Sequence, residues 1–298
     1  MKKPEVVYGG QAVIEGVMMR GPDSWAVAVR RPDQSIVVKK EPLKGISSSR
    51  IWRRPFIRGV MVLYEALVIG IQALTYSAEQ AVGGEEEHPV GRWEIAATLI
   101  LGLGLGIVLF VVIPTGLAHL VRNEVPSSLG QNIVEGVVRL AVFLLYILLV
   151  GMIPDIRRVF AYHGAEHRVV NACEAEAELT PDGVRRFSVL HPRCGTAFLL
   201  MVMVLSIFVF SLLGKQVLWW RIVSRILLLP LIAAISYEMT RFGASNMHNP
   251  FIRALITPGL WLQRMTTREP DDLQAAVALA ALEAVLVKEG EHNVREAG

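Results

Sequence analysis

The chain has 298 residues, of which 53% are hydrophobic and only 19% are charged. Its mean hydropathy of +0.44 is too high for an ordinary soluble domain and predicts a membrane protein, so membrane lipids are its expected surroundings. The formal net charge is only +3, and the basic residues are scattered along the chain. A nucleic-acid binder would show a basic face, so a nucleic-acid partner is not expected. Two cysteines are too few for a disulfide framework.

The N-terminal part of the chain predicts a small β-rich region. The runs "WAVAVRR" and "SIVVKKE" are rich in β-branched residues, and the turn signal Pro32-Asp33-Gln34 joins them. The preceding "GGQAVIEGVMMRGP" reads as a strand whose glycines indicate tight turns or close backbone approach. Within it, Glu15 is expected to be a hydrogen-bonded carboxylate at a sheet edge. So few strands cannot fold alone, so we expect them to pack against residues 154–196.

Four apolar stretches are expected to cross a membrane as helices. Pro114 predicts a kink near the end of the first. The second carries Glu135 and Arg139, an i,i+4 pair that must be satisfied internally or lie at the interface. The four stretches are 95–120, 133–153, 197–213 and 222–237.

Residues 60–74 are also apolar, but they carry Glu65 and, at 15 residues, are short for a membrane span. An interfacial or bundle-packed helix is expected there. The C-terminal stretch 271–290 predicts a further helix, with Asp271 as its N-cap and Gly290 as its stop.

The distribution of Lys and Arg predicts the topology. Residues 1–94 hold thirteen of them, 154–196 hold six and 241–298 hold six, whereas 121–132 hold only Arg122. The positive-inside rule therefore places both termini and the 154–196 loop in the cytoplasm. In that reducing compartment, Cys173 and Cys194 are expected to be free or metal-bound rather than bridged.

The 154–196 loop holds the candidate site. A helix is expected from Pro154, with a shorter helix opened by Thr180 as cap and Pro181. On the first helix, "YHGAEH" places His163 and His167 one turn apart on one face. Further on, "HPRCGT" separates His191 from Cys194 by two residues, a spacing from which both can reach one soft cation. The loop therefore offers two half-sites for a divalent metal, with zinc the expected ion.

His-x-x-Glu-His is also the inverted zincin pattern, in which two histidines bind zinc and the glutamate activates a water. Glu166 is then the predicted general base. Such enzymes need a further carboxylate ligand, for which Glu238 and Glu174 are candidates. A second interpretation is structural: the two histidines pack at a membrane interface beside Glu166 and Glu174. His191 and Cys194 are then turn residues.

Several motifs resemble the YqhQ-type bacterial membrane family, a family of unknown function described as predicted metal-dependent enzymes. They are "GGQAVIEGVMMRGP", "RVFAYHGAEHRVVNACE", "LHPRCGTAFLL", "SYEM" and "LQRMTTREP", and they run in order from about Tyr8 to Val287. The resemblance implies a bacterial cytoplasmic (inner) membrane protein. It also places His163, Glu166, His167, His191, Arg193, Cys194 and Glu238 in family motifs, and Cys173 outside the site.

The predicted fold class is a mainly α polytopic membrane protein with about four transmembrane helices, a β-rich cytoplasmic N-terminal part, and a helical cytoplasmic loop and tail. The predicted divisions are 1–59 (β-rich), 60–94 (interfacial helix and linker), 95–153 (first two spans), 154–196 (His/Cys loop), 197–240 (last two spans) and 241–298 (helical tail).

Two functions fit these features. The first is a metal-dependent hydrolase at the cytoplasmic membrane face. The second is a non-catalytic scaffold for a membrane-protein partner, in which the His/Cys site is structural. A transporter is disfavoured, because the first and third predicted spans carry almost no ionisable residues.

Overall fold

The N-terminal strands form one antiparallel sheet in the computed structural model, which describes residues 8–43, 57–82, 92–214 and 216–286. The strands pair in chain order, and the turn predicted at Pro32-Asp33-Gln34 joins the last two. The run read as one strand, 9–22, is instead a hairpin of two strands. Val13 pairs with Gly16, so the first turn consists of Ile14 and Glu15, and Glu15 has a positive φ of 50°. The strands are β1 (Gly9–Val13), β2 (Gly16–Arg20), β3 (Ser24–Arg30) and β4 (Ile36–Pro42).

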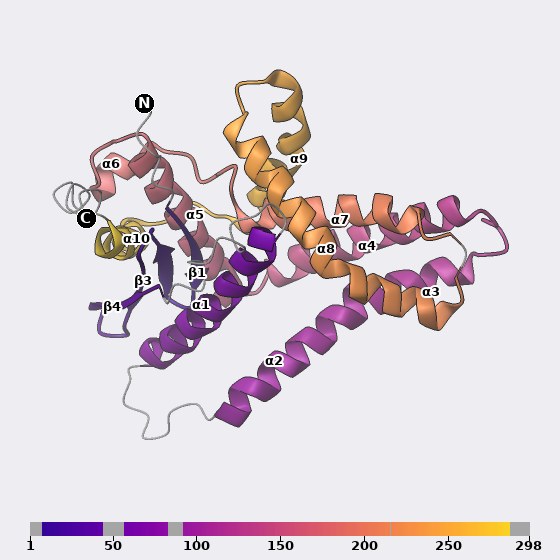
Figure 1. The fold of residues 1–298 in the computed structure, drawn as a ribbon. Coiled ribbons are helices and arrows are strands. Elements are labelled where there is room, and N and C mark those ends of the chain that lie inside the picture. Colours follow the sequence, from indigo (N-terminus) through magenta and orange to yellow (C-terminus); the bar gives the residue numbers. More distant parts are fainter. Residues whose placement is uncertain (1–7, 44–56, 83–91, 215, 287–298) are drawn as a thin grey trace, which may run out of the picture.

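Both faces of the sheet are covered, because its two central strands present mostly apolar side chains to the helices. Helices α5 (Pro154–Glu174) and α10 (Asp272–Val285) pack on one face, which buries Val17, Met19, Ala26 and Ala28 in a shared core. Helix α1 (Ile57–Ala81) covers the other face, whose buried side chains include Met18, Trp25 and Val27. Figure 1 shows the sheet between these helices at one end of the molecule. The expected packing of the strands on the 154–196 loop is confirmed.

Helix α1 is longer than the sequence predicted. It has 25 residues, so its length alone no longer argues against a membrane span. It packs on the sheet and on α8, as expected for a bundle-packed helix. The helix continues because no proline or glycine follows Gly70 before Ala81. Glu65 within it accepts a hydrogen bond from Arg20 of β2 at 2.5 Å, which satisfies the polar group that had argued against a span.

Four helices in the described part of the chain could cross a membrane by length and composition. The predicted number of four is confirmed, but these are not the same four helices as those predicted. Besides α1 they are Ala97–Leu120, Ser128–Val150 (α4) and Leu218–Ser245 (α8). Residues 197–213 were predicted as a span, but helix α7 (Gly195–Ser211) has only 17 residues. It is highly apolar and packs against α4, α8 and α9 (Pro250–Thr266). Helix α1 qualifies by length and composition, but it covers one face of the sheet whose other face packs on α5, so α1 and α5 lie on the same side of the membrane, with the sheet between them.

The predicted kink before Pro114 is a π-helical turn, Val108–Val112 (η2), between α2 (Arg92–Ile107) and α3 (Ile113–Leu120). Pro114 has no N–H to donate to the carbonyl of Phe110, four residues earlier. Arg139 of α4 donates its Nε–H to this carbonyl at 2.8 Å. Arg139 also binds Glu135 at 2.7 Å, and both side chains are buried. The i,i+4 pair is thus satisfied inside the bundle, as its position in an apolar helix requires.

The loop and tail helices begin where the sequence predicted. Helix α5 starts at Pro154, and α6 (Pro181–Arg185) is capped by the Thr180 hydroxyl. Asp271 caps α10 in a capping box with Gln274. Helix α10 ends at Val285, and the predicted stop at Gly290 lies outside the described residues. Helix α9 was not anticipated in the tail. Helix α8 runs through Tyr237, so Glu238 lies within it rather than beyond its end.

Gly164 of α5 permits a close contact with the segment that follows α9. Arg268 N donates to the carbonyl of Phe160 at 2.9 Å, so this segment runs directly along α5. A Cβ on residue 164 would lie 2.0 Å from the backbone oxygen of Arg268, whereas one on Gly116 of α3 would meet nothing within 4 Å. Only the first position therefore requires glycine for packing.

We expect Gly164→Ala to lower the thermal midpoint of the purified protein in detergent, through a loss of roughly 1–3 kcal/mol from overpacking. The matched variant Gly116→Ala should leave the midpoint unchanged or raise it slightly, because alanine favours a helix over glycine. Circular dichroism at 222 nm follows both transitions. Equal midpoints for the two variants would show that the 268 segment does not press against α5.

Candidate metal centre

Helix α5 carries polar side chains into a buried position. Its first turn has Pro154 at a position where no N–H is needed and Asp155 near the positive helix end. Further along, Glu166 and His167 are only 5% and 1% exposed, between the sheet on one side and residues 187–194 on the other. Buried polar groups need hydrogen-bond partners or a bound ion, so the partners of this helix define what the site can do.

Three potential metal ligands converge at α5. One ligand atom each from His163, His167 and Cys194 lies within 4.8 Å of the other two. The two imidazole rings are 4.4 Å apart between centroids, as expected from one helical turn. The sulfur of Cys194 lies 3.3 Å from Nε2 of His163. The predicted pair of histidines is therefore joined by the cysteine of the second motif.

Backbone carbonyls fix the orientation of both imidazoles. Nδ1 of His163 lies 2.8 Å from the oxygen of Thr266, and Nδ1 of His167 lies 2.6 Å from the oxygen of Val189. A carbonyl oxygen can only accept, so each Nδ1 carries the proton and each Nε2 presents its lone pair. This is the arrangement in which a histidine ligand is held by its second nitrogen in metal sites.

Cys194 is held at the start of α7, where it is the N-cap residue. Its sulfur accepts from the backbone N–H of Thr196 at 3.4 Å and lies 3.1 Å from the Thr196 hydroxyl. The positive end of a helix stabilises a negatively charged ligand at this position. The side chain is buried, with 5% of the residue exposed.

Glu166 lies beside the three ligands but outside their group. Its Oε2 is 3.5 Å from Nε2 of His167. Strand β1 covers it closely, because a Cβ on Gly10 would lie 3.0 Å from Glu166 Cγ. The carboxylate is therefore enclosed beside Nε2 of His167.

His191 adjoins the site without joining it. Its ring centroid is 5.7 Å from that of His167. Gln263 of α9 holds its backbone by accepting from its N–H at 2.9 Å and donating to its carbonyl at 2.8 Å. Within the described residues, Nε2 of His191 is buried without a hydrogen bond. Burial lowers the pKa of His191, opposed by the nearby charge of Glu166, so the ring is neutral at neutral pH.

The two candidate carboxylate ligands have other partners. Glu174 accepts a hydrogen bond from Arg193 and lies 3.5 Å from Nε2 of His191. Glu238 is held by Arg58 of α1, whose Nε donates to it at 2.7 Å. Neither carboxylate joins the group formed by His163, His167 and Cys194. The structure thus does not bring Glu238 to the predicted metal site.

Two further expectations can be compared with the structure. Glu15 accepts hydrogen bonds from Arg158 at 2.6 Å and from Tyr162 at 3.3 Å, so the predicted hydrogen bonding is confirmed, although Glu15 lies in the β1–β2 turn rather than at a sheet edge. Cys173 is a free thiol away from the ligand group, and burial raises its pKa. The carbonyls of Thr266 and Val189 were missed, because no side-chain pattern reveals a backbone acceptor.

Comparison with known proteins places this chain in a family without an assigned function. Residues 54–288 match the family model described as "Protein of unknown function (DUF1385)". The chain is 35% identical over 292 residues to "Uncharacterized protein YqhQ" of Bacillus subtilis (strain 168), which covers 94% of this chain and 92% of that protein. No solved structure matches.

The fold and comparisons together define a helical membrane protein with a small N-terminal sheet. The chain belongs to the DUF1385 family, in agreement with its resemblance to YqhQ-type proteins.

The lowered pKa of His191 predicts a pH dependence of stability. The unfolded chain binds a proton at this residue near pH 6.5, whereas the folded protein resists it. Its contribution is therefore fully present above about pH 6.5 and is lost as the pH falls towards the lower folded pKa. We expect His191→Asn to flatten the fall in thermal midpoint between pH 7 and pH 5. The exposed His248 offers a control, because His248→Asn should keep the wild-type slope. Identical slopes for all three proteins would contradict the assignment.

Proposed function

We propose that this membrane protein binds one zinc-type divalent cation through His163, His167 and Cys194 and uses it for hydrolysis, with Glu166 as general base. The observation that carries the proposal is the pair of carbonyl contacts that fixes both Nδ1 protons. These contacts leave Nε2 of each imidazole free, in a group whose ligand atoms all lie within 4.8 Å of one another, and Nε2 of His163 lies 3.3 Å from the sulfur of Cys194. Packing alone does not require this coincidence.

The donor set fits zinc. Imidazole nitrogen and thiolate sulfur are its usual protein ligands, and both also suit other soft divalent ions. The structure groups three such ligands rather than four, with His191 beside them. Three protein ligands with an open position are typical of catalytic zinc, whereas four are typical of structural zinc.

Glu166 supplies the remaining function. A zinc-type ion bound here would provide Lewis-acid chemistry and lower the pKa of a coordinated water. The carboxylate of Glu166 lies 3.5 Å from His167 Nε2. At that distance it would take a proton from a water held beside this nitrogen. Because the carboxylate is enclosed, bulk water competes little for its lone pairs.

The place of the site in the fold suggests the class of substrate. Cys194 begins α7, which packs in the bundle, while His163 and His167 belong to a helix that packs on the sheet. The site therefore lies where the sheet domain meets the membrane helices. A lipid-linked molecule or a segment of another membrane protein fits this position best.

A second candidate function is a structural one. The same residues connect three separate parts of the chain, since His163 binds the end of α9, His167 binds the 187–191 segment and Cys194 caps α7. A metal bound by them would fix the sheet domain on the bundle, as in a scaffold for a membrane-protein partner. Glu166 would then have no chemical role.

Metal content tests the proposal directly. Protein purified without chelator should carry about one zinc-type ion per chain by inductively coupled plasma mass spectrometry. His163→Ala, His167→Ala and Cys194→Ala should each lose it, because two ligands hold zinc far more weakly than three. Glu166→Gln should retain it. Full metal in all three ligand variants, or none in the wild type, would contradict the proposal.

Glu166→Gln also separates the two functions. In cells that lack the native protein, a hydrolase predicts that wild type but not Glu166→Gln restores the lipid and membrane-protein profile measured by mass spectrometry. A scaffold predicts that both restore it. Glu178→Gln, on the exposed side of the same loop, is the matched control and should behave as wild type.

We further propose that α2–α3, α4, α7 and α8 cross a bacterial inner membrane, that α1 stays with the sheet it covers, and that both termini and the site face the cytoplasm. The sheet domain and the 121–127 loop lie at opposite ends of the bundle (Figure 1). The cationic segments of the sequence cluster on the sheet side, and this asymmetry supports the orientation.

Cysteine labelling in intact cells tests this topology. Because Cys194 is buried, single exposed positions are the better reporters, in a Cys173→Ser background. Asn123→Cys, in the loop after α3, should react with a membrane-impermeant maleimide, and Lys40→Cys, on β4, should react only after lysis. The reverse pattern would invert the proposed topology.

A further inference from the structure

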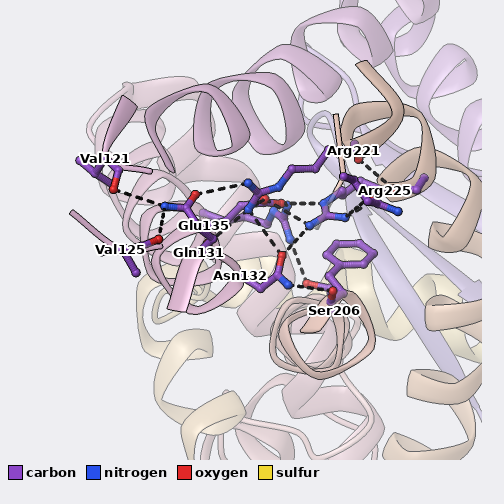
Figure 2. Close-up of polar contacts among 12 residues, drawn as sticks. Val121, Val125, Gln131, Asn132, Glu135, Ser206, Arg221 and Arg225 are labelled. Atoms are coloured by element: carbon purple, nitrogen blue, oxygen red, sulfur yellow. Dashed lines mark hydrogen bonds and ion pairs between the residues drawn. The ribbon is translucent and has the colours of Figure 1, made fainter. Parts of the chain in front are cut away.

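The bundle contains a buried group of charges that the proposed metal chemistry does not use. Glu135 of α4 accepts from Arg139 at 2.7 Å and from Arg225 of α8 at 3.0 Å, and it pairs with Arg221 of α8 at 2.8 Å. All four residues are buried, with exposed fractions between 1% and 8%. Figure 2 shows Glu135, Arg221 and Arg225 converging between the helices, together with Gln131, Asn132 and Ser206.

The positive charges outnumber the negative one. Three guanidinium groups share one carboxylate, and among the residues that the structure describes no second carboxylate is paired with them. The remaining contacts are neutral: Asn132 accepts from Arg225 at 2.7 Å, and the Phe210 ring lies under the guanidinium of Arg225 at 4.5 Å. Neutral acceptors solvate a cation but do not cancel its charge. Excess charge within an apolar bundle is costly unless an anion completes it.

A cavity reaches this group from the end of the bundle away from the sheet. It has a volume of about 330 Å³ and is lined by Arg221, Arg122 and His119 together with polar residues of the same loops. Among the described residues, no carboxylate lines it. Arg122 is exposed at its rim, and its Nη1 donates to His119 at 2.8 Å. The cavity thus joins a solvent-accessible arginine to a buried one.

We infer that this cavity binds a phosphate-type anion, which Arg221 and Arg122 hold from two sides. Guanidinium groups present paired N–H donors that match phosphate oxygens. Ser128 and Gln131 at the start of α4 also line the cavity, where a helix N-terminus favours negative charge. The phosphate belongs either to an anionic lipid headgroup at the membrane surface or to a free phosphate ion, and both have the same chemistry.

The test compares anions on the purified full-length protein in a neutral detergent. Thermal midpoints are measured with phosphatidylglycerol, with zwitterionic phosphatidylcholine and with inorganic phosphate. We expect phosphatidylglycerol or phosphate, but not phosphatidylcholine, to raise the wild-type midpoint. A response to phosphatidylglycerol alone assigns the site to a lipid headgroup, and a response to inorganic phosphate assigns it to a free ion.

Matched variants decide whether the cavity is responsible. Arg122→Gln and Arg221→Gln should each weaken binding of the anion about tenfold, as expected for the loss of one charge-assisted contact. Arg253→Gln makes the same change at an exposed position of α9 and should respond as wild type. Arg122 is exposed, so its variant remains informative if Arg221→Gln fails to fold. The inference is wrong if neither anion stabilises the wild type, or if Arg122→Gln responds as fully as Arg253→Gln.

Discussion

The buried polar face of α5 is the constraint on which the rest of the site depends. Arg168, His167 and Asn171 all donate to the carbonyls of residues 187–190, at distances from 2.6 to 3.2 Å. His163 donates to Thr266 at the end of α9. His167 is buried, so leaving its donor unpaired would cost about 1–3 kcal/mol, and the other three side chains are partly buried. Satisfying these donors positions the 187–194 segment and α9, and it also fixes the two imidazoles beside Cys194.

Much of this arrangement follows from local sequence. Pro154 and Thr180 mark the starts of α5 and α6, the hairpin turns mark the sheet, and one helical turn places His163 beside His167. The pairing of Glu135 with Arg139 was also predictable, because charged side chains in an apolar helix lack water and need each other as partners. In each case the relevant residues are near neighbours along the chain, where propensity and spacing decide the outcome.

The remaining features depend on contacts between distant segments. The sequence paired Cys194 with His191, but capping of α7 turns the sulfur towards His163. Glu238 was predicted as a ligand, but Arg58 of α1 pairs with it in the structure. Glu65 lies within the apolar helix α1 because Arg20 of the sheet pairs with it. These partners lie 31 to 180 residues apart, so no local pattern could reveal them.

The central claim is that His163, His167 and Cys194 bind one metal ion, and zinc K-edge X-ray absorption of the purified protein tests it most directly. The account predicts one sulfur scatterer at about 2.3 Å and imidazole nitrogens at about 2.0–2.1 Å. The sulfur shell should disappear in Cys194→Ser while the nitrogen shell persists in any metal that remains. A spectrum of the wild type without a sulfur scatterer, or one unchanged by Cys194→Ser, would contradict the account.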